Sequence, residues 1–175
     1  MENIKKVSKF LSLILRHKPQ TIGLTLDSHG WAEIDELLSK SKIMKLNREI
    51  LDKVVKENDK QRFIIDGDRI RANQGHSLDI DLELKVVTPP NLLFHGTATQ
   101  FIASIMKIGL IKQRRQHVHL SEKRETAISV GRRHGEVVLL KIDSQKMFDD
   151  GYDFYLSENG VWLTDVVPFK YLSKR

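Results

Sequence analysis

Apolar residues near the start of the chain recur with the three-four spacing of one helical face, which predicts an amphipathic helix. The stripe consists of Ile4, Val7, Phe10, Leu11, Ile14 and Leu15. We expect the helix to end at Lys18-Pro19, because proline disfavours helical geometry in the residue before it. Arg16 and His17 are therefore predicted at the C-terminus of this helix, beside the exit from the core.

The pattern changes after the first helix. A turn at 27–30 is followed by a short apolar helix pattern at 34–38 and a longer one at 46–55. Residues 63–72 then read as a hairpin, with Gly67 supplying the turn. Helices followed by a terminal hairpin resemble a winged helix, an arrangement that binds nucleic acid. Strand alternation places Arg69 and Arg71 on one face and Ile70 on the other. These two arginines equally suit an exposed sheet edge protected by charge.

The second half of the chain is predicted to form short strands with a few helices. Strands are predicted at 92–95, 117–121, 137–142, 154–156 and 161–163. A helix through Phe101–Met106 is expected to end at Gly109. Thr88-Pro89-Pro90 is the best boundary, since paired prolines interrupt both helices and sheet ladders. We therefore predict two lobes, at 1–87 and 91–175.

Composition narrows the class of protein. At 175 residues with 40% apolar residues, the chain has enough material for one large domain or two small lobes. It contains no cysteine, which excludes disulfides, thiolate zinc sites and a cysteine nucleophile and suits a reducing compartment. The apolar stretch at the N-terminus is interrupted by charges, so neither a signal peptide nor a membrane span is predicted.

The formal net charge of +6 favours a polyanionic partner. The basic residues concentrate between 107 and 133, where only Glu122 and Glu125 oppose them. They are Lys107, Lys112, Arg114, Arg115, Lys123, Arg124, Arg132 and Arg133. A solvated basic face is the plain alternative to a binding surface.

Several histidines have suggestive neighbours. His95-Gly96-Thr97 is predicted at the end of a strand, where glycine lets a ligand approach the backbone. His117 and His119 would share one strand face, but no third zinc ligand is evident, so we expect no metal. Gly75-His76-Ser77 is unusually polar and also fits a plain turn. The dinucleotide, Walker and nucleophile-elbow glycine motifs are all missing from the sequence.

Seven strings taken together resemble the RNA 2′-phosphotransferase family, called KptA in bacteria. They are LSLILRHKP at 11–19, DSHGWAEIDELL at 27–38, IRANQGHS at 70–77, LFHGT at 93–97, HVHLS at 117–121, VGRRHG at 130–135 and NGVWLT at 159–164. They occur in order over nearly the whole chain, which makes the resemblance far more specific than any single motif.

The resemblance implies an α+β protein with an N-terminal winged-helix RNA lobe and a C-terminal lobe of ADP-ribosyltransferase fold. It implies a cytoplasmic enzyme that uses NAD as a co-substrate and RNA carrying a 2′-phosphate as substrate. In the implied first step the 2′-phosphate attacks C1″ of NAD and expels nicotinamide. In the second, the ribose 2″-hydroxyl attacks phosphorus and gives RNA with a free 2′-hydroxyl and ADP-ribose 1″,2″-cyclic phosphate. No spare apolar helix face stands out in the sequence, so we expect a monomer.

The resemblance also implies roles for particular residues. The catalytic group falls on Arg16, His17, Arg71 and Arg133, the last because the family motif reads Gly-x-Arg. The residues implied for the RNA phosphate are Arg16, His17, Arg69, Arg71 and His76. Those implied for NAD are His95, Gly96, Thr97, His119, Leu120 and Ser121. Arginine suits a phosphate dianion because its planar donors stay charged.

Two alternatives remain open at the level of the site. His17 is either the proton donor to the departing RNA 2′-oxygen or a phosphate-binding residue only. Leu120 and Ser121 either line the adenosine side of NAD or form a plain structural strand.

Two further alternatives concern function. One rival is an ADP-ribosyltransferase acting on phosphorylated nucleic-acid ends or proteins, which stops after the first step. It shares every NAD residue but does not need Arg16, His17 and Arg71. The other is a non-catalytic winged-helix binder, which leaves the histidines of the second lobe unexplained.

Overall fold

The computed structural model describes residues 2–174 and is an α+β structure of helices and small antiparallel sheets. Its chain divides into two compact units, unit 1 ending at Glu83 and unit 2 beginning at Leu84. The division precedes the predicted boundary at Thr88, because Val86 forms a β-bridge with Tyr155. Val87 N also donates to the carbonyl oxygen of Phe154 at 2.8 Å. The segment before the prolines therefore belongs to unit 2.

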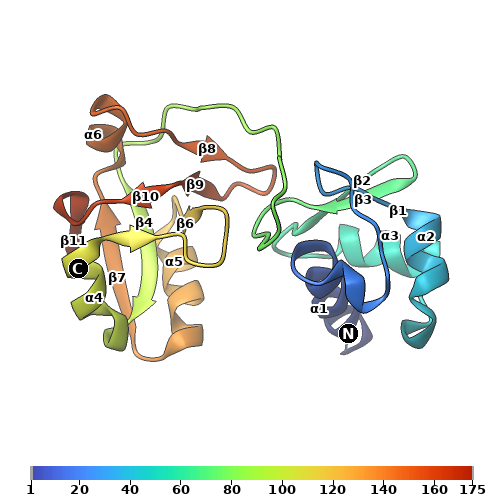
Figure 1. Ribbon diagram of the computed structural model, residues 1–175. Helices are drawn as coiled ribbons and strands as arrows, with labels where there is room; N and C mark the ends of the chain where they lie inside the picture. The colour runs from blue at the N-terminus through green and yellow to red at the C-terminus, as the bar shows by residue number, and fades with distance from the viewer. Residues whose placement is uncertain (1, 175) are drawn as a thin grey trace. The chain divides into compact units, whose positions relative to one another are not determined.

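Unit 1 is built from helices and one antiparallel sheet of strand order β1-β3-β2. Figure 1 shows the β2–β3 hairpin along the upper side of the unit, with α1 and α3 below it. In chain order the elements are α1 (Glu2–Arg16), η1 (Pro19–Thr21), β1 (Ala32–Glu33), α2 (Ile34–Lys40), η2 (Lys42–Met44), α3 (Arg48–Lys56), β2 (Phe63–Asp66) and β3 (Arg69–Ala72).

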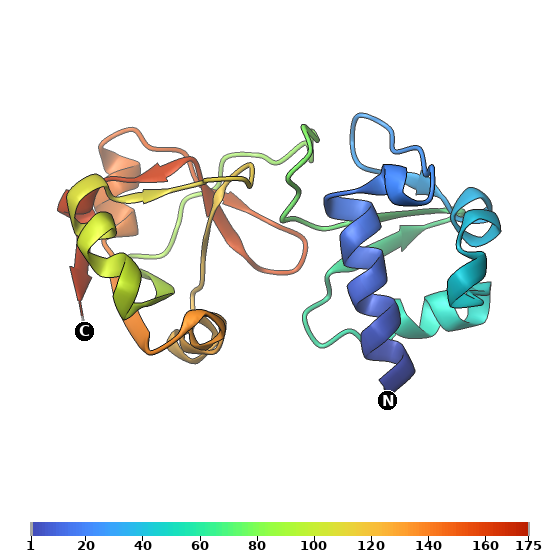
Figure 2. The same cartoon turned by 60° about the horizontal axis from the view of Figure 1, so that its bottom comes forward.

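The predicted first helix is confirmed, and its apolar stripe forms the core of unit 1. Leu11, Ile14 and Leu15 are fully buried and pack in one cluster with Leu51 of α3 and Ile70 of β3. Each buried aliphatic side chain of this size contributes about 1.5–3 kcal/mol. Figure 2 shows α1 from the side, leading into the turn of η1. The helix ends at Arg16, just before the predicted stop at Lys18-Pro19. Among the described residues no helix has the length and apolar character needed to span a membrane.

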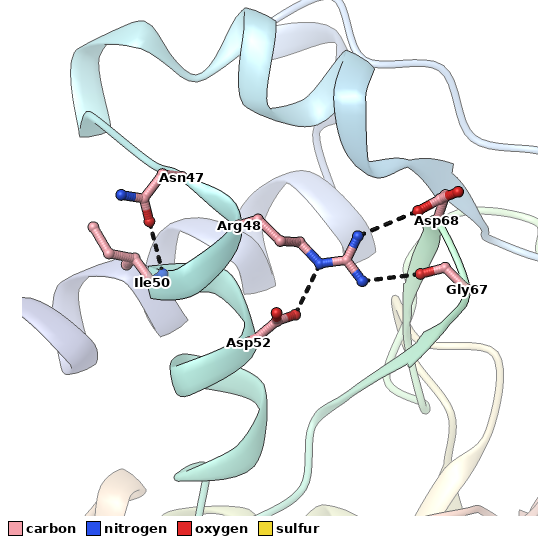
Figure 3. A network of polar contacts seen from close by, with 6 residues as sticks. All are labelled: Asn47, Arg48, Ile50, Asp52, Gly67 and Asp68. Carbon is pink, nitrogen blue, oxygen red and sulfur yellow. Dashed lines mark hydrogen bonds and ion pairs between the residues drawn. The ribbon is translucent and has the colours of Figure 1, made fainter.

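The predicted hairpin is also confirmed, and its turn is fastened to α3. Gly67 has a φ of 59°, a left-handed conformation that favours glycine. Arg48, the first residue of α3, bonds Asp52 at 3.0 Å and Asp68 at 3.3 Å, and it donates to the carbonyl oxygen of Gly67 at 3.0 Å (Figure 3). The side chain of Asn47 caps the same helix by accepting from Ile50 N. Local polar contacts therefore fix the angle between α3 and the hairpin.

Unit 2 contains two three-stranded antiparallel sheets, of order β11-β7-β4 and β6-β9-β8, and the pair β10-β5. In Figure 1 the long strands β4 and β7 lie side by side, with α5 next to them. The elements are β4 (Leu93–Ala98), η3 (Thr99–Phe101), α4 (Ile102–Ile108), β5 (Leu110–Ile111), β6 (Val118–Leu120), α5 (Arg124–Gly131), η4 (Arg132–His134), β7 (Val137–Ile142), α6 (Ser144–Asp149), β8 (Tyr155–Leu156), β9 (Trp162–Thr164), β10 (Val166–Val167), η5 (Phe169–Tyr171) and β11 (Leu172–Lys174).

The strand predicted at 92–95 is longer in the structure and runs to Ala98. Gly96 explains how this strand packs: a Cβ there would lie 1.7 Å from the carbonyl oxygen of Ala127 in α5. Gly131, at the end of α5, meets β4 in the same way, since its Cβ would lie 2.8 Å from the carbonyl carbon of Gly96. Two glycines thus let a helix lie directly on a strand backbone, and α5 itself was not predicted.

Candidate functional sites in the two units

The arginine face of the hairpin forms around Trp31. The β1–β3 register pairs Ala32 with Ile70 and Glu33 with Arg69, so its continuation brings Trp31 opposite Arg71. The guanidinium carbons of Arg71 and Arg69 lie 4.6 Å and 5.0 Å from the centre of the indole ring, within cation–π range. The predicted alternation is confirmed, because Ile70 between them is fully buried on the opposite face. Arg69 also forms an ion pair with Asp66 at 3.6 Å, whereas Arg71 is held by the ring.

The C-terminus of α1 supplies a second pair of cationic groups. Arg16 is the last helical residue, and its guanidinium lies 6.0 Å from the ring centre of Phe63. His17 follows it, with Nδ1 at 2.9 Å from Oγ of Ser77. The backbone amide of Ser77 donates to the carbonyl oxygen of Arg16 at 3.0 Å. The polar segment after β3 is therefore tied to the end of α1.

His76 lies among these cations and is 1% exposed. Burial, reinforced by the positive charges of Arg16, His17 and Arg71, lowers the pKa of His76 to about 4. The imidazole is consequently neutral near pH 7. We call Arg16, His17, Arg71 and His76 the unit 1 cluster, and the structure brings all four predicted residues together.

Buried polar atoms without a hydrogen-bond partner gather in β3 and the segment that follows it. Within the described part of the chain they include Nε of Arg71, both ring nitrogens of His76, Oδ1 of Asn73 and Oε1 of Gln74. Buried polar atoms are normally bonded, because leaving one unsatisfied costs about 1–3 kcal/mol. Such a concentration is typical of a surface that completes its bonds with water or a ligand.

Unit 2 holds a separate network of histidines and arginines. His95 lies on β4, and its Nδ1 donates to the carbonyl oxygen of His119 on β6 at 3.0 Å. Burial lowers the pKa of His95, so the ring is neutral and keeps Nε2 as an acceptor. Arg115 donates from Nη1 to Nδ1 of His119 at 2.8 Å, which leaves the proton of a neutral His119 on Nε2.

Arg133 joins this network electrostatically. It lies in η4, directly after α5, and η4 contacts β4. Partial burial and the charge of Arg133 both lower the pKa of Arg115, which places the two guanidinium groups in one electrostatic neighbourhood. We call His95, Arg115, His119 and Arg133 the unit 2 network.

The other residues predicted for NAD occupy structural positions. His95, Gly96 and Thr97 lie inside β4, so the prediction that they end the strand is wrong; the ladder with β7 continues to Ala98. Leu120 is 1% exposed in the core of unit 2. Ser121 exchanges two backbone bonds of 2.8 Å with Phe94. Their contact with NAD stays a prediction.

Across residues 2–174, no three histidine, aspartate or glutamate side chains gather as a metal-binding set. His117 instead packs on the ring of Tyr155, with 5.5 Å between ring centroids.

Trp31 and Arg115 were not selected as site residues from the sequence. Trp31 could have been identified only from its position opposite Arg71, which depends on the pairing of β1 with β3. The sequence feature that pointed to Arg115 was its position four residues before His119, within the basic run at 107–133.

Comparison with known proteins gives a consistent family. The model described as RNA 2′-phosphotransferase, Tpt1 / KptA family matches residues 2–166. A protein of Acaryochloris marina named probable RNA 2′-phosphotransferase is 58% identical over 175 residues, covering 97% of this chain and 96% of the relative. Proteins with the same name from Flavobacterium johnsoniae and Agrobacterium fabrum are 53% and 54% identical. Those alignments cover 98% and 95% of this chain, and 97% and 91% of the relatives.

Proposed function

The chain belongs to the RNA 2′-phosphotransferase, Tpt1 / KptA family, and we propose that it removes an internal 2′-phosphate from RNA with NAD as co-substrate. The observation that carries the proposal is the unit 1 cluster, in which two arginines and two histidines meet without a carboxylate among the groups that act on His76. The positive charges of Arg16 and Arg71, gathered around His76 beside unsatisfied buried polar atoms, suit a phosphate dianion. Unit 1 is the RNA-binding unit in this proposal.

The order of elements supports a winged-helix interpretation of unit 1. A helix, a strand, two helices and a two-stranded hairpin follow one another, and the first strand joins the hairpin sheet. In this proposal Arg71 and Arg16 hold the 2′-phosphate with charged planar donors, and Trp31 fixes the direction of Arg71. Arg69 contributes attraction to the RNA backbone, with its charge shared with Asp66.

The two histidines of the cluster take different roles. His76 is neutral at pH 7 and can donate one hydrogen bond and accept another without adding charge. His17 is oriented by Ser77 and is proposed as the proton donor to the RNA 2′-oxygen as it departs. A phosphate-binding role for His17 alone remains the alternative.

The donor set of unit 2 fits a dinucleotide co-substrate. NAD, when bound, supplies the ADP-ribosyl group that accepts the phosphate. His95 presents a neutral acceptor nitrogen, His119 presents an N–H, and Arg133 supplies positive charge for a diphosphate. Trp162 Nε1 is buried with no hydrogen-bond partner in the described part of the chain, which is a further donor in this unit. We propose that unit 2 has the ADP-ribosyltransferase-like fold and that His95, Thr97 and His119 orient the nicotinamide ribose.

A direct experiment tests the proposal. The protein is incubated with a short RNA carrying one internal 2′-phosphate, with and without NAD, and the products are resolved by mass. The expected result is NAD-dependent loss of the phosphate together with ADP-ribose cyclic phosphate. Stable ADP-ribosylated RNA would instead support the enzyme that stops after one step. No change in the RNA would contradict the proposal and favour a binding protein.

A further inference from the structure

Arg115 has a position in unit 2 that neither the motifs nor the proposed roles use. It closes a turn in which its backbone amide donates to the carbonyl oxygen of Lys112 at 3.0 Å. Its side chain then reaches His119, four residues later, and donates to Nδ1 at 2.8 Å. Because guanidinium groups only donate, this bond excludes a proton on Nδ1 of His119. Arg115 therefore selects the histidine tautomer.

The same network continues into β4 through the main chain. The carbonyl oxygen of His119 accepts from Nδ1 of His95 at 3.0 Å. The bridge between Phe94 and Ser121 fixes the distance between β4 and β6 beside this bond. The two imidazoles consequently present opposite chemistry, an acceptor on Nε2 of His95 and a donor on Nε2 of His119.

Besides burial, the charge of Arg133 lowers the pKa of Arg115. Arg133 follows Gly131 by two residues, and the contact of Gly131 with Gly96 seats the end of α5 on β4, the strand that carries His95. Within residues 2–174, no ion pair joins either arginine to a carboxylate. Two arginines that share a site without an acid are attracted to a common anion.

We propose that Arg115 and Arg133 bind one phosphoanion together, and that Arg115 is also the positioning residue that holds His119 with its proton on Nε2. The inference rests on the proposed function only where it identifies the anion as the diphosphate of the ADP-ribosyl donor. The same chemistry would accept an RNA phosphate, so the test must separate the two sources.

The test measures binding of ADP-ribose and, separately, of 2′-phosphorylated RNA without NAD, by calorimetry. Arg115→Ala is compared with Arg114→Ala, which removes the same charge one residue away. We expect Arg115→Ala to weaken ADP-ribose binding about tenfold, the effect of one charged hydrogen-bonded contact. Arg115→Lys should recover part of that loss, and Arg114→Ala should change the affinity less than about twofold. RNA binding should be unchanged in all three, with the fold checked by circular dichroism.

Imidazole spectra give a readout that a purely structural role would not move. Two-bond proton–nitrogen NMR should show unprotonated Nδ1 in His119 of the wild type and a mixture of tautomers in Arg115→Ala. Equal effects of Arg114→Ala and Arg115→Ala, or a protonated Nδ1 in the wild type, would overturn the inference. A loss confined to RNA binding would assign the arginines to the RNA phosphate and overturn the diphosphate assignment.

Failure of the proposed function is separable from failure of this inference. A wild-type protein that binds ADP-ribose through Arg115 but leaves 2′-phosphorylated RNA intact contradicts the function and supports the inference. If the protein removes the phosphate with NAD, but Arg115→Ala leaves the affinity for ADP-ribose unchanged, the function is supported and the inference is contradicted.

Discussion

The unit 1 cluster and the unit 2 network use the same residue types in different physical states. In unit 1, arginines are held by aromatic rings, and His76 is buried with unbonded ring nitrogens among the described residues. In unit 2, the proton of His95 is fixed by a hydrogen bond to a carbonyl oxygen, and that of His119 by the donor on its opposite ring nitrogen. The first arrangement gathers positive charges around a buried neutral imidazole, whereas the second fixes its histidine tautomers through hydrogen bonds. The presence of histidines and arginines in the sequence therefore indicates a candidate site, but it does not indicate their burial, protonation or hydrogen bonding.

The largest expected effect concerns the binding of the RNA 2′-phosphate that we propose for the unit 1 cluster. Arg71→Ala should lower turnover of 2′-phosphorylated RNA by about 1,000-fold, the upper range for removal of one charge-stabilising donor. Single-turnover mass analysis measures the loss, and urea unfolding checks that the variant remains folded without the contact between Arg71 and Trp31.

Arg69→Ala is the matched control for Arg71, since both arginines lie on Trp31 and only Arg69 is paired with Asp66. A loss of activity in Arg69→Ala as large as that in Arg71→Ala would contradict the special position of Arg71.

The second effect tests whether unit 2 is rigidly preorganised. Gly96→Ala should reduce the free energy of unfolding by about 3 kcal/mol, because its methyl group would overlap the carbonyl oxygen of Ala127. Urea unfolding of the full-length variant measures this loss, and Gly151→Ala, also in unit 2, is the control. No atom lies within 4 Å of a Cβ at Gly151, so only its φ of 97° opposes the substitution, at a cost of about 1 kcal/mol. Equal losses would show that α5 yields to the methyl group.

The third effect follows from the depressed pKa of His76. Between the unfolded pKa of 6.5 and the folded pKa of about 4, the unfolded chain binds the proton and the folded chain does not, so stability falls as pH falls. From pH 7 to pH 5 this one group should lower the free energy of unfolding by about 2 kcal/mol. The decrease should shrink by a similar amount in His76→Gln. An NMR titration of His76 near its ordinary pKa would contradict the neutral, buried ring.

The smallest effect concerns Arg48, whose guanidinium donates to Asp52, Asp68 and the carbonyl oxygen of Gly67 in Figure 3. Arg48→Ala should lower Tm slightly and leave turnover unchanged, because the bonds are exposed and serve only the hairpin turn. Thermal unfolding and the RNA assay together check this. A large fall in activity would mean that the hairpin turn positions Arg71.

Much of the fold could be predicted where one periodicity dominates. The stripe of α1, the hairpin at Phe63–Ala72 and the strand at Val137–Ile142 all have the predicted bounds or nearly so. The helix α5 could not be predicted, because its place depends on the meeting of Gly96 and Gly131 rather than on an apolar stripe. The same contact explains why β4 continues through a glycine that appeared to end it.

The candidate sites divide in the same way. Arg69 and Arg71 were predicted on one face by alternation, which is a local property of a strand. Trp31 required the non-local pairing of β1 with β3, and Arg115 required a turn that brings its side chain back to His119. The chemistry of His76 was equally hidden, since its pKa depends on burial among cations from α1 and β3.

The bridge between Val86 and Tyr155 has a practical consequence for dissecting the protein. A fragment cut at the paired prolines would remove the partner of β8 and leave the carbonyl oxygen of Phe154 without its amide donor from Val87. A fragment that begins at Leu84 retains both bonds. For this chain, the most useful cloning boundary lies upstream of the sequence signal that looks like a linker.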